Sequence, residues 1–219
     1  MPNLSELPVI ILGAGGHARV LLAILRAEGA AIAGCTALER PDDRAWPQDV
    51  PYLGGIEVLD GMDPAKCMLV NGIGSAGRVS ARRKVFERAC DAGFRFRGLR
   101  HPSAIVDPAA RVDPTALIMA GAIIQCGARI GANVIVNTGA IVDHDSIVGD
   151  HSHVATGARL AGEVTLGTAV HVGAGATIIQ RGRLGDEAVV AAGAVVIRPV
   201  EPGATYGGVP AKPLVSRSS

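Results

Sequence analysis

The chain of 219 residues has few aromatic side chains and no imbalance of charge. Only 3% of its residues are Phe, Trp or Tyr although 48% are hydrophobic, so a core must be built mainly from aliphatic side chains. The net charge of +1, from 21 basic and 20 acidic residues, argues against a nucleic-acid or anionic-membrane partner. With 29 glycines, this composition favours a repetitive, closely stacked architecture.

Cysteines and long apolar runs are also scarce. Four cysteines, Cys35, Cys67, Cys90 and Cys126, are scattered without CxxC spacing, which predicts buried thiols in a reducing compartment. The apolar run 9–12 follows no basic segment and is too short for a signal peptide or a membrane span. We therefore expect a soluble cytoplasmic protein.

A six-residue repeat runs without a break from Ala104 to Pro199. In all sixteen hexads the third residue is Val, Ile or Leu, and the first is Ala, Val, Ser or Gly. One buried aliphatic every six residues fits a short strand plus a turn, and three such units make a triangular coil. Such coils stack about 4.8 Å apart. The repeat predicts a parallel β-helix domain over 101–199, followed by a C-terminal cap and tail over 200–219.

The first hundred residues alternate between β-rich and helical patterns. We expect strands at 8–12, 31–35, 66–74 and 94–99, and helices at 18–29 and 75–93 with Ser75 as N-cap. This order predicts a small α/β domain over 1–100 with a Rossmann-like parallel sheet. The basic run Arg82, Arg83, Lys84 and Arg88 is interpreted as a solvated helix face.

A glycine-rich loop follows the first expected strand. Gly13, Gly15, Gly16 and His17 fit a GxGxxA pattern between a strand and a helix, where the backbone can approach a phosphate. A tight structural turn and nicotinamide binding remain alternatives. The domain is about half the size expected for a dinucleotide, and no clear ribose-binding carboxylate ends the second strand. The diphosphate of a sugar nucleotide is therefore preferred.

Four segments together resemble one group of bacterial sugar acetyltransferases. They are "ILGAGGHA" (11–18), "HPSA" (101–104), "NTGAIVDHDSIVGDHSHVATGARLAG" (137–162) and "GGVPAK" (207–212). The group includes sialic-acid O-acetyltransferase-like proteins and the bacillosamine and perosamine N-acetyltransferases. The resemblance implies a left-handed β-helix, a homotrimer with sites between subunits, acetyl-CoA as donor and a role in lipopolysaccharide O-antigen biosynthesis. The implied acceptor is the 4-amino group of a nucleotide-linked 4-amino-4,6-dideoxy sugar.

The resemblance also implies roles for individual residues. His144, between two aspartates, is the implied general base, and Asp145 is its orienting partner. His153 is implied to lie near the acetyl group and thiol of the coenzyme. The remaining implied contacts are Asn137, Gly162, Gly173 and Ala174 with the coenzyme, and Gly13, Gly15, Gly16 and His17 with the nucleotide diphosphate. Uridine-binding members carry an Asp pair where this chain reads "CTALER" (35–40), which favours a GDP-perosamine-like acceptor, with a UDP-linked one still possible.

The hexad pattern gives an independent reason to select His144. It occupies the fifth slot of its hexad, so its ring is expected to project outward at a turn, towards a neighbouring subunit. Imidazole titrates near neutrality, and a carboxylate can fix its tautomer. The backbone N–H of Gly162 is a candidate donor to the thioester oxygen. No Ser or Cys is placed as a nucleophile that could form an acyl-enzyme. Direct transfer of the acetyl group from acetyl-CoA to the acceptor is therefore preferred.

Other histidines and other functions stay open. His171 follows His153 by 18 residues and is expected to stack beside it, whereas His151 is expected to be solvated and His101 to be structural. O-acetylation of a sugar hydroxyl would use the same base. A zinc hydrolyase needs about three converging ligands, and the HxxxxH pair is absent, so no metal is expected. A non-catalytic sugar-nucleotide sensor is the last alternative.

Overall fold

The computed structural model describes residues 6–42, 46–75, 77 and 79–214. The chain forms two compact units, which are described separately below. The first unit is built from Met1–Gly74 and Ala81–Leu99, and the second from Ser75–Ser80 and Arg100–Ser219. Among the described helices, none is long and apolar enough to cross a membrane.

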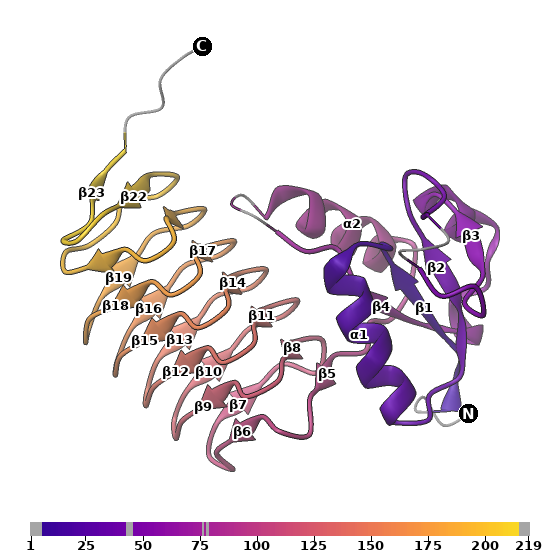
Figure 1. The fold of residues 1–219 in the computed structure, drawn as a ribbon, viewed down its shortest axis with the longest axis horizontal. Helices are drawn as coiled ribbons and strands as arrows, with labels where there is room; N and C mark the ends of the chain where they lie inside the picture. The colour runs from indigo at the N-terminus through magenta and orange to yellow at the C-terminus, as the bar shows by residue number, and fades with distance from the viewer. Residues whose placement is uncertain (1–5, 43–45, 76, 78, 215–219) are drawn as a thin grey trace. The chain divides into compact units, whose positions relative to one another are not determined.

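The first unit contains a four-stranded parallel sheet, as expected for a Rossmann-like domain, with strand order β3-β2-β1-β4 (Figure 1). The central strand β1 is buried along its whole length. The strands are β1 (Val9–Leu12), β2 (Ile32–Thr36), β3 (Tyr52–Gly54) and β4 (Met68–Asn71). The helices are α1 (Gly16–Ala27), α2 (Ser80–Asp91) and the short 3-10 segments η2 (Ile56–Gly61) and η3 (Pro64–Lys66). Helix α1 buries Leu21 and Leu25 on one face, as its helical periodicity predicts.

Two elements of this unit differ from those expected. The predicted strand over 94–99 is only partly present, because a single parallel bridge joins Phe96 to Leu69 and Leu99 begins β5 (Leu99–Arg100), which belongs to another sheet. The fourth strand of the sheet is instead β3, whose short glycine-ended segment gives no strand periodicity. The predicted helix start at Ser75 is also wrong, because α2 begins at Ser80.

Arg82 is buried and does not belong to a solvated helix face. Its side chain is only 1% exposed, and its Nη1 donates to the carbonyls of Asn71 at 2.6 Å and Ile73 at 2.9 Å. Asn71 Nδ2 donates in return to the Arg82 carbonyl at 3.2 Å. Burial lowers the pKa of the Arg82 guanidinium to about 9. Arg82 therefore ties the first turn of α2 to the chain that leaves β4.

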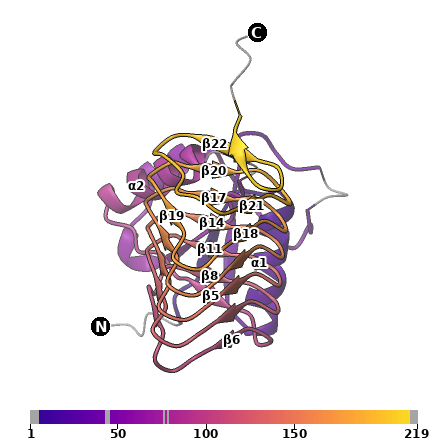
Figure 2. The same ribbon diagram turned by 90° about the vertical axis from the view of Figure 1, so that its left-hand side faces the viewer.

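The second unit is the parallel β-helix expected from the hexads, and Figures 1 and 2 show its coils stacked in chain order. Its strands form three sheets, one for each side of the triangular coil. The six-stranded sheet holds β6 (Ile105–Val106), β9 (Ile123–Ile124), β12 (Ile141–Val142), β15 (Arg159–Leu160), β18 (Thr177–Ile178) and β21 (Val195–Val196). The five-stranded sheet holds β7 (Arg111–Val112), β10 (Arg129–Ile130), β13 (Ile147–Val148), β16 (Thr165–Leu166) and β19 (Arg183–Leu184). The eight-stranded sheet holds β5 (Leu99–Arg100), β8 (Leu117–Ile118), β11 (Ile135–Val136), β14 (His153–Val154), β17 (His171–Val172), β20 (Val189–Val190), β22 (Thr205–Gly207) and β23 (Lys212–Pro213).

The core of the β-helix follows the hexad pattern. Third-position side chains are buried from Ile118 to Val196, and they are partly buried only in the first coil, at Val106 and Val112. Strands pair in parallel with those 18 residues away, so that His153 lies in register with His171. The prediction that the third position points inward is therefore confirmed.

Every turn from Gly121 to Gly193 places its sixth hexad residue in the left-handed region. Glycine adopts this conformation freely, but Asp145 at φ 58° and Glu163 at φ 61° adopt it at a steric cost. The repeat therefore holds three carboxylates, Asp145, Glu163 and Glu187, at corners where glycine would be easier to accommodate.

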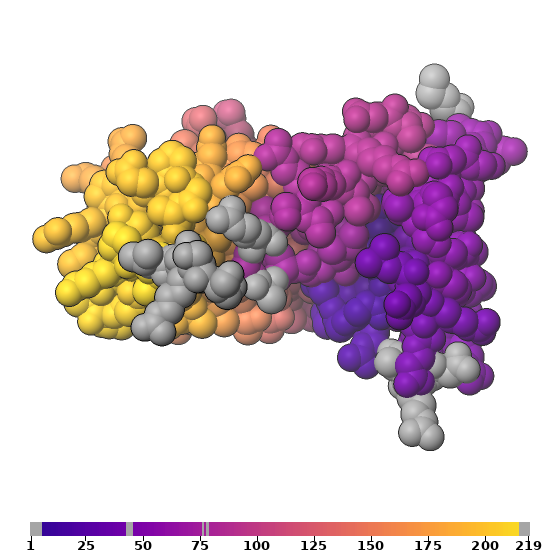
Figure 3. Space-filling view, turned by 90° about the horizontal axis from the view of Figure 1, so that it is seen from above, coloured from indigo at the N-terminus to yellow at the C-terminus, as the bar shows by residue number. Residues whose placement is uncertain are grey.

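Two further strands, β22 and β23, follow the hexads. Strand β22 pairs with β20 and with β23, and the atoms of β22 and β23, yellow in Figure 3, lie directly beside those of the last coils.

Two cysteines, Cys35 and Cys67, are buried as expected. Cys90 and Cys126 are exposed, contrary to expectation, because one lies on α2 and the other in the fifth slot of a turn.

Candidate active site

His144 lies in the turn between β12 and β13, at the corner where the six-stranded and five-stranded sheets meet. Its side chain is 44% exposed, as the fifth slot predicts. The ring Nδ1 lies 3.0 Å from Asp145 Oδ2, and the backbone N–H donates to Asp143 Oδ1 at 2.8 Å. The two flanking aspartates thus hold the backbone and the ring of the same histidine.

Asp145 is held in place from the preceding coil. Its backbone N–H donates to the Cys126 carbonyl at 3.0 Å, and its Oδ1 lies so close to Gly127 that a Cβ there would overlap it. The hydrogen bond to Asp145 raises the pKa of His144, and the charges of Asp143, Asp145 and Glu163 raise it further. With Nδ1–H directed at Asp145, the lone pair of His144 Nε2 is available to accept a proton.

Gly162 lies one coil beyond His144 and directly against its ring. A Cβ at Gly162 would come within 2.6 Å of His144 Cε1 and would also overlap Nε2. Only glycine therefore lets the imidazole lie over this stretch of backbone. The structure places Asp145 beside His144, the pair that the sequence analysis selected. It also brings in Gly162, which was named only as a coenzyme contact and as a donor to the thioester oxygen.

A third carboxylate, Glu163, adjoins this corner and was missed from sequence. Its N–H donates to the His144 carbonyl at 2.9 Å. Its carboxylate accepts from Gln180 Nε2 at 3.2 Å and from Arg181 Nε at 3.1 Å, and the bond to Arg181 is the main cause that lowers the pKa of Glu163. The signal was present, because Asp145, Glu163 and Arg181 follow one another at 18-residue intervals.

His153 lies on a different side of the β-helix. It begins β14 in the eight-stranded sheet, which faces away from the corner between the other two sheets. The residue is 5% exposed, and its Nε2 lies 3.1 Å from Asn137 Nδ2 while its Nδ1 lies 2.6 Å from Ser75 Oγ. Within one chain, the structure brings Asn137 to His153 but leaves His144 at the opposite corner.

Gly173 and Ala174 lie in the turn after β17, two coils beyond Asn137. A Cβ at Gly173 would come within 2.6 Å of the Val190 carbonyl oxygen and of the Ala192 amide nitrogen. These two residues therefore share a turn column with Asn137, whereas Gly162 belongs to the His144 corner. The residues expected around the coenzyme thus fall into two groups.

The remaining histidines of the β-helix are held by the coils. The His171 ring lies edge-on to His153, with centroids 5.1 Å apart, and burial lowers its pKa. Within the described part of the chain, His171 Nδ1 is buried without a hydrogen-bond partner. His151 is not simply solvated as expected, because it is half-buried and its Nδ1 lies 3.0 Å from Asn133 Nδ2. His101 Nδ1 lies 2.8 Å from Ser103 Oγ.

In the first unit, the glycine loop lies at the carboxyl end of β1. A Cβ at Gly13 would be 3.2 Å from the backbone of Gly72, so the loops after β1 and β4 approach closely. The space around Gly15, which caps α1, and around Gly16, which begins it, is open. The strand order reverses between β1 and β4, and ligands of parallel α/β sheets bind at such a point. The Gly72–Gly74 loop was not singled out from sequence.

His17 packs beneath this loop. A Cβ on Gly74 would lie 3.3 Å from His17 Cβ, and His17 Nε2 is buried without a hydrogen-bond partner among the described residues. Burial, and then the charge of Arg82, lowers the pKa of His17 to about 4. His17 is therefore uncharged at neutral pH, and a diphosphate at this loop would contact backbone N–H groups instead of a cationic ring.

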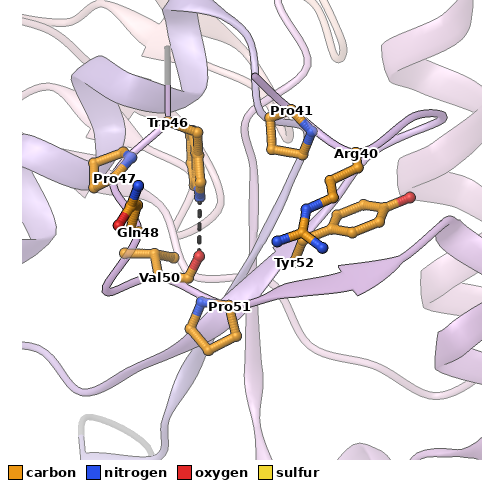
Figure 4. A pocket seen from close by; sticks show the side chains of 8 residues that line it. All are labelled: Arg40, Pro41, Trp46, Pro47, Gln48, Val50, Pro51 and Tyr52. Carbon is orange, nitrogen blue, oxygen red and sulfur yellow. Dashed lines mark hydrogen bonds between the residues drawn. The ribbon is translucent and has the colours of Figure 1, made fainter. Parts of the chain in front are cut away.

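A separate pocket of about 360 Å³ lies at the β2–β3 side of the sheet. Figure 4 shows Arg40 beside the ring of Tyr52, with Trp46 across the pocket. Trp46 Nε1 donates to the Val50 carbonyl at 3.2 Å, which holds the indole in place. Among the residues that the structure describes, no cluster of three or more His, Cys, Asp or Glu could hold a metal ion.

A β-helix of hexads with an imidazole–carboxylate pair at an exposed corner defines a hexapeptide-repeat acyltransferase. The family model for the PglD N-terminal domain matches residues 8–89. The chain belongs to the hexapeptide-repeat sugar acetyltransferases of the sialic-acid O-acetyltransferase and bacillosamine N-acetyltransferase group, and it is an acyltransferase. No curated protein matches the chain.

Solved structures of acetyltransferases are similar over nearly the whole chain. The acetyltransferase domain of PglB from Neisseria gonorrhoeae, in complex with acetyl coenzyme A, is 31% identical with a TM-score of 0.86, covering 94% of this chain and 98% of that one. PerB from Caulobacter crescentus, in complex with CoA and GDP-perosamine, is 34% identical with a TM-score of 0.83, covering 95% and 97%. WeeI from Acinetobacter baumannii, at 17% identity and a TM-score of 0.67, shares the fold over 95% of this chain and 100% of that one.

Proposed function

We propose that this protein is an acetyl-CoA-dependent N-acetyltransferase that acts on the 4-amino group of a nucleotide-linked 4-amino-4,6-dideoxy sugar. The observation that carries the proposal is the His144–Asp145 pair at 3.0 Å, with the second ring nitrogen free over Gly162. The similarity to PglB, solved with acetyl coenzyme A, and to PerB, solved with CoA and GDP-perosamine, supports the donor and the class of acceptor.

His144 acts as the general base in this proposal. The acceptor amine bonds to the acetyl carbon as the thioester C–S bond breaks, and His144 Nε2 takes the proton that the amine loses. Asp145 keeps the other ring nitrogen protonated and favours the imidazolium, which then returns the proton to the leaving thiolate. The raised pKa of His144 makes the neutral ring a stronger base. Acetyl-CoA supplies the acetyl group, and the Gly162 backbone beside the ring is the candidate donor to the thioester oxygen.

We infer that the site is shared between subunits. His144 lies at the corner of the six- and five-stranded sheets, whereas His153 and Asn137 lie on the eight-stranded side. The width of the β-helix therefore separates these groups within one chain. A single site that uses both groups needs two copies, and a closed trimer would supply three such sites.

The nucleotide would bind to the first unit. Gly15 and Gly16, which follow the turn at Gly13, offer an open helix N-terminus for the diphosphate. Arg40 and Gln48 line the pocket at the β2–β3 side with hydrogen-bond donors, which suits the two acceptor atoms, O6 and N7, of a guanine. The base would therefore be guanine in preference to uracil.

The test of base preference uses the intrinsic fluorescence of Trp46, the chain's single tryptophan, which lines this pocket. GDP is expected to change the emission and to bind more tightly than UDP, and Arg40→Ala is expected to remove that difference. Equal binding of GDP and UDP by the unaltered protein would contradict the assignment of the base.

The test of the reaction is an acceptor panel that measures free thiol released from acetyl-CoA. GDP-linked 4-amino sugars are expected to be acetylated fastest, followed by UDP-linked ones. Product analysis must locate the acetyl group on nitrogen. Acetylation of hydroxyl groups alone, for example on free sialic acid, would overturn the proposal in favour of a sugar O-acetyltransferase.

A further inference from the structure

The eight-stranded sheet carries a chain of hydrogen bonds that no assigned role explains. Ser75 Oγ lies 2.6 Å from His153 Nδ1, although the two residues are 78 apart in sequence. On the other side of the ring, His153 Nε2 lies 3.1 Å from Asn137 Nδ2. Ser75 is half-buried and belongs to the Ser75–Ser80 segment of the second unit.

A backbone contact at Asn137 determines the direction of the two hydrogen bonds that His153 makes with Asn137 and Ser75. The N–H of Thr138 donates to Asn137 Oδ1 at 2.8 Å, which orients the amide so that Nδ2 faces His153. An amide nitrogen can only donate, so His153 Nε2 must accept. The proton of the neutral ring is then on Nδ1, and it is donated to Ser75 Oγ.

Ser75 therefore accepts from His153, and its own hydroxyl hydrogen is directed away from the ring. A serine hydroxyl has one hydrogen to donate, and the tautomer of His153 prevents it from being used inside the chain. The result is an oriented donor beside His153, whose other ring nitrogen contacts Asn137 of the turn column.

His171 packs against this arrangement from the next coil. Its ring stands at 75° to that of His153, and the two residues are in register on neighbouring strands. Burial lowers the pKa of His171, which disfavours a charge on its ring. His153 is thus confined by the His171 ring, an amide and a hydroxyl, all of which restrict its rotation.

We propose, on the basis of the function proposed above, that Ser75 contacts the thioester cosubstrate by donating its hydroxyl hydrogen to a carbonyl oxygen of acetyl-CoA. His153 and Asn137 are positioning residues that act through Ser75. The carbonyl belongs either to the acetyl group or to a pantetheine amide. The comparison of acetyl-CoA with CoA distinguishes the two, because only the first compound carries the acetyl oxygen.

The experiment measures the affinity of the full chain for acetyl-CoA and for CoA by calorimetry. Ser75→Ala is expected to weaken acetyl-CoA binding about five- to tenfold, the value of one hydrogen bond, and Ser75→Thr is expected to restore it. If CoA affinity is unchanged in Ser75→Ala, the carbonyl is that of the acetyl group, and if CoA weakens equally it is a pantetheine amide. Unchanged affinity of Ser75→Ala for both compounds would overturn the proposal.

The chain contains a matched control and a spectroscopic readout. Ser103 Oγ lies 2.8 Å from His101 Nδ1, a similar contact that lies in the same turn column but two coils before Asn137, so Ser103→Ala should leave both affinities unchanged. Nitrogen-15 NMR should show His153 as the Nδ1–H tautomer in the unaltered protein and a mixture in Ser75→Ala. An Nε2–H tautomer in the unaltered protein would contradict the proposal. Sugar acetylation is not measured, so a wrong acceptor would leave this test intact, whereas no binding of acetyl-CoA at all would overturn both proposals.

Discussion

The corner at His144 and the face at His153 belong to the same β-helix, yet they place an imidazole in opposite environments. At the corner, the ring is 44% exposed and bound to a carboxylate, which raises its pKa. On the eight-stranded face, His153 and His171 are 5% and 6% exposed, and burial lowers the pKa of His171. The difference shows how one repeat can hold a proton acceptor at a turn and two buried, fixed rings on a strand.

Slot position within the hexad explains this division. The fifth and sixth slots lie in the turns, where most of them reach solvent although Asn133, Gly162 and Ala169 are buried. The second slot of β14 and β17 lies on a flat face, where neighbouring coils and the Ser75 side chain cover it. We therefore expect substitutions at the His144 corner and on the His153 face to differ in their effects.

The largest effect is expected from His144→Ala. Loss of a general base reduces the rate roughly 10²- to 10⁴-fold, so kcat/KM for acetyl transfer should fall by that factor while acetyl-CoA still binds. Steady-state assays of thiol release measure this loss. His101→Ala, which removes a histidine bonded only to its own turn, serves as control, and an activity of His144→Ala within threefold of the unaltered protein would contradict the role.

Gly162→Ala should move the ring without removing it. The new methyl group would overlap His144 Nε2 and Cε1, and a displacement of about 1 Å can cost 10²-fold in rate. We expect kcat to fall roughly 10- to 100-fold while the thermal midpoint changes little. Gly61→Ala, at a position with open space and no left-handed φ, is the matched control. Full activity in Gly162→Ala would show that the ring does not work in this position.

Asp145→Asn should shift the pH profile. The pKa of His144 is raised above its ordinary value in the folded protein, so the neutral base is lost as pH falls through that raised value. Asparagine tolerates the left-handed φ of 58° but removes the charge, so the acid limb of kcat/KM should move to lower pH. The rate should fall roughly tenfold, less than for a buried pair, because this one is exposed. An acid limb at unchanged pH would contradict the pairing.

Unlike His144, the buried His17 is expected to affect the free energy of unfolding and not the rate of acetyl transfer. The folded-state pKa of His17 is about 4, below its ordinary 6.5, so protonation favours the unfolded chain as pH falls from 6.5 towards 4. At pH 5 this costs roughly 2 kcal/mol relative to pH 7. Urea unfolding at the two pH values measures the loss, and His17→Gln should reduce it. An equal pH dependence in His17→Gln would assign it to other groups.

The sequence was sufficient to predict the β-helix and the His144 corner because both depend on local periodicity. A strict six-residue period determines which side chains point inward, and the 18-residue coil determines which turns stack. The same reasoning could have found Glu163 and Arg181, which follow Asp145 at that interval.

Contacts between distant segments could not be predicted in this way. Arg82 appeared to belong to a solvated run, but the carbonyls of Asn71 and Ile73 bury it. Ser75 looked like a helix cap, and its real partner His153 lies 78 residues away. The β-rich run 94–99 forms only a bridge at Phe96 and the first residue of β5 at Leu99, because strand pairing depends on partners that local propensity does not specify.

The most direct test of the shared site mixes two variants that each lack one histidine of the site. His144→Ala and His153→Ala are purified separately, unfolded together in equal amounts and refolded as mixed trimers. If each site takes His144 from one subunit and His153 from its neighbour, about a quarter of the sites regain both histidines, and acetyl transfer should recover to roughly that fraction. No recovery in the mixture, while the unaltered protein refolds to full activity, would contradict the account.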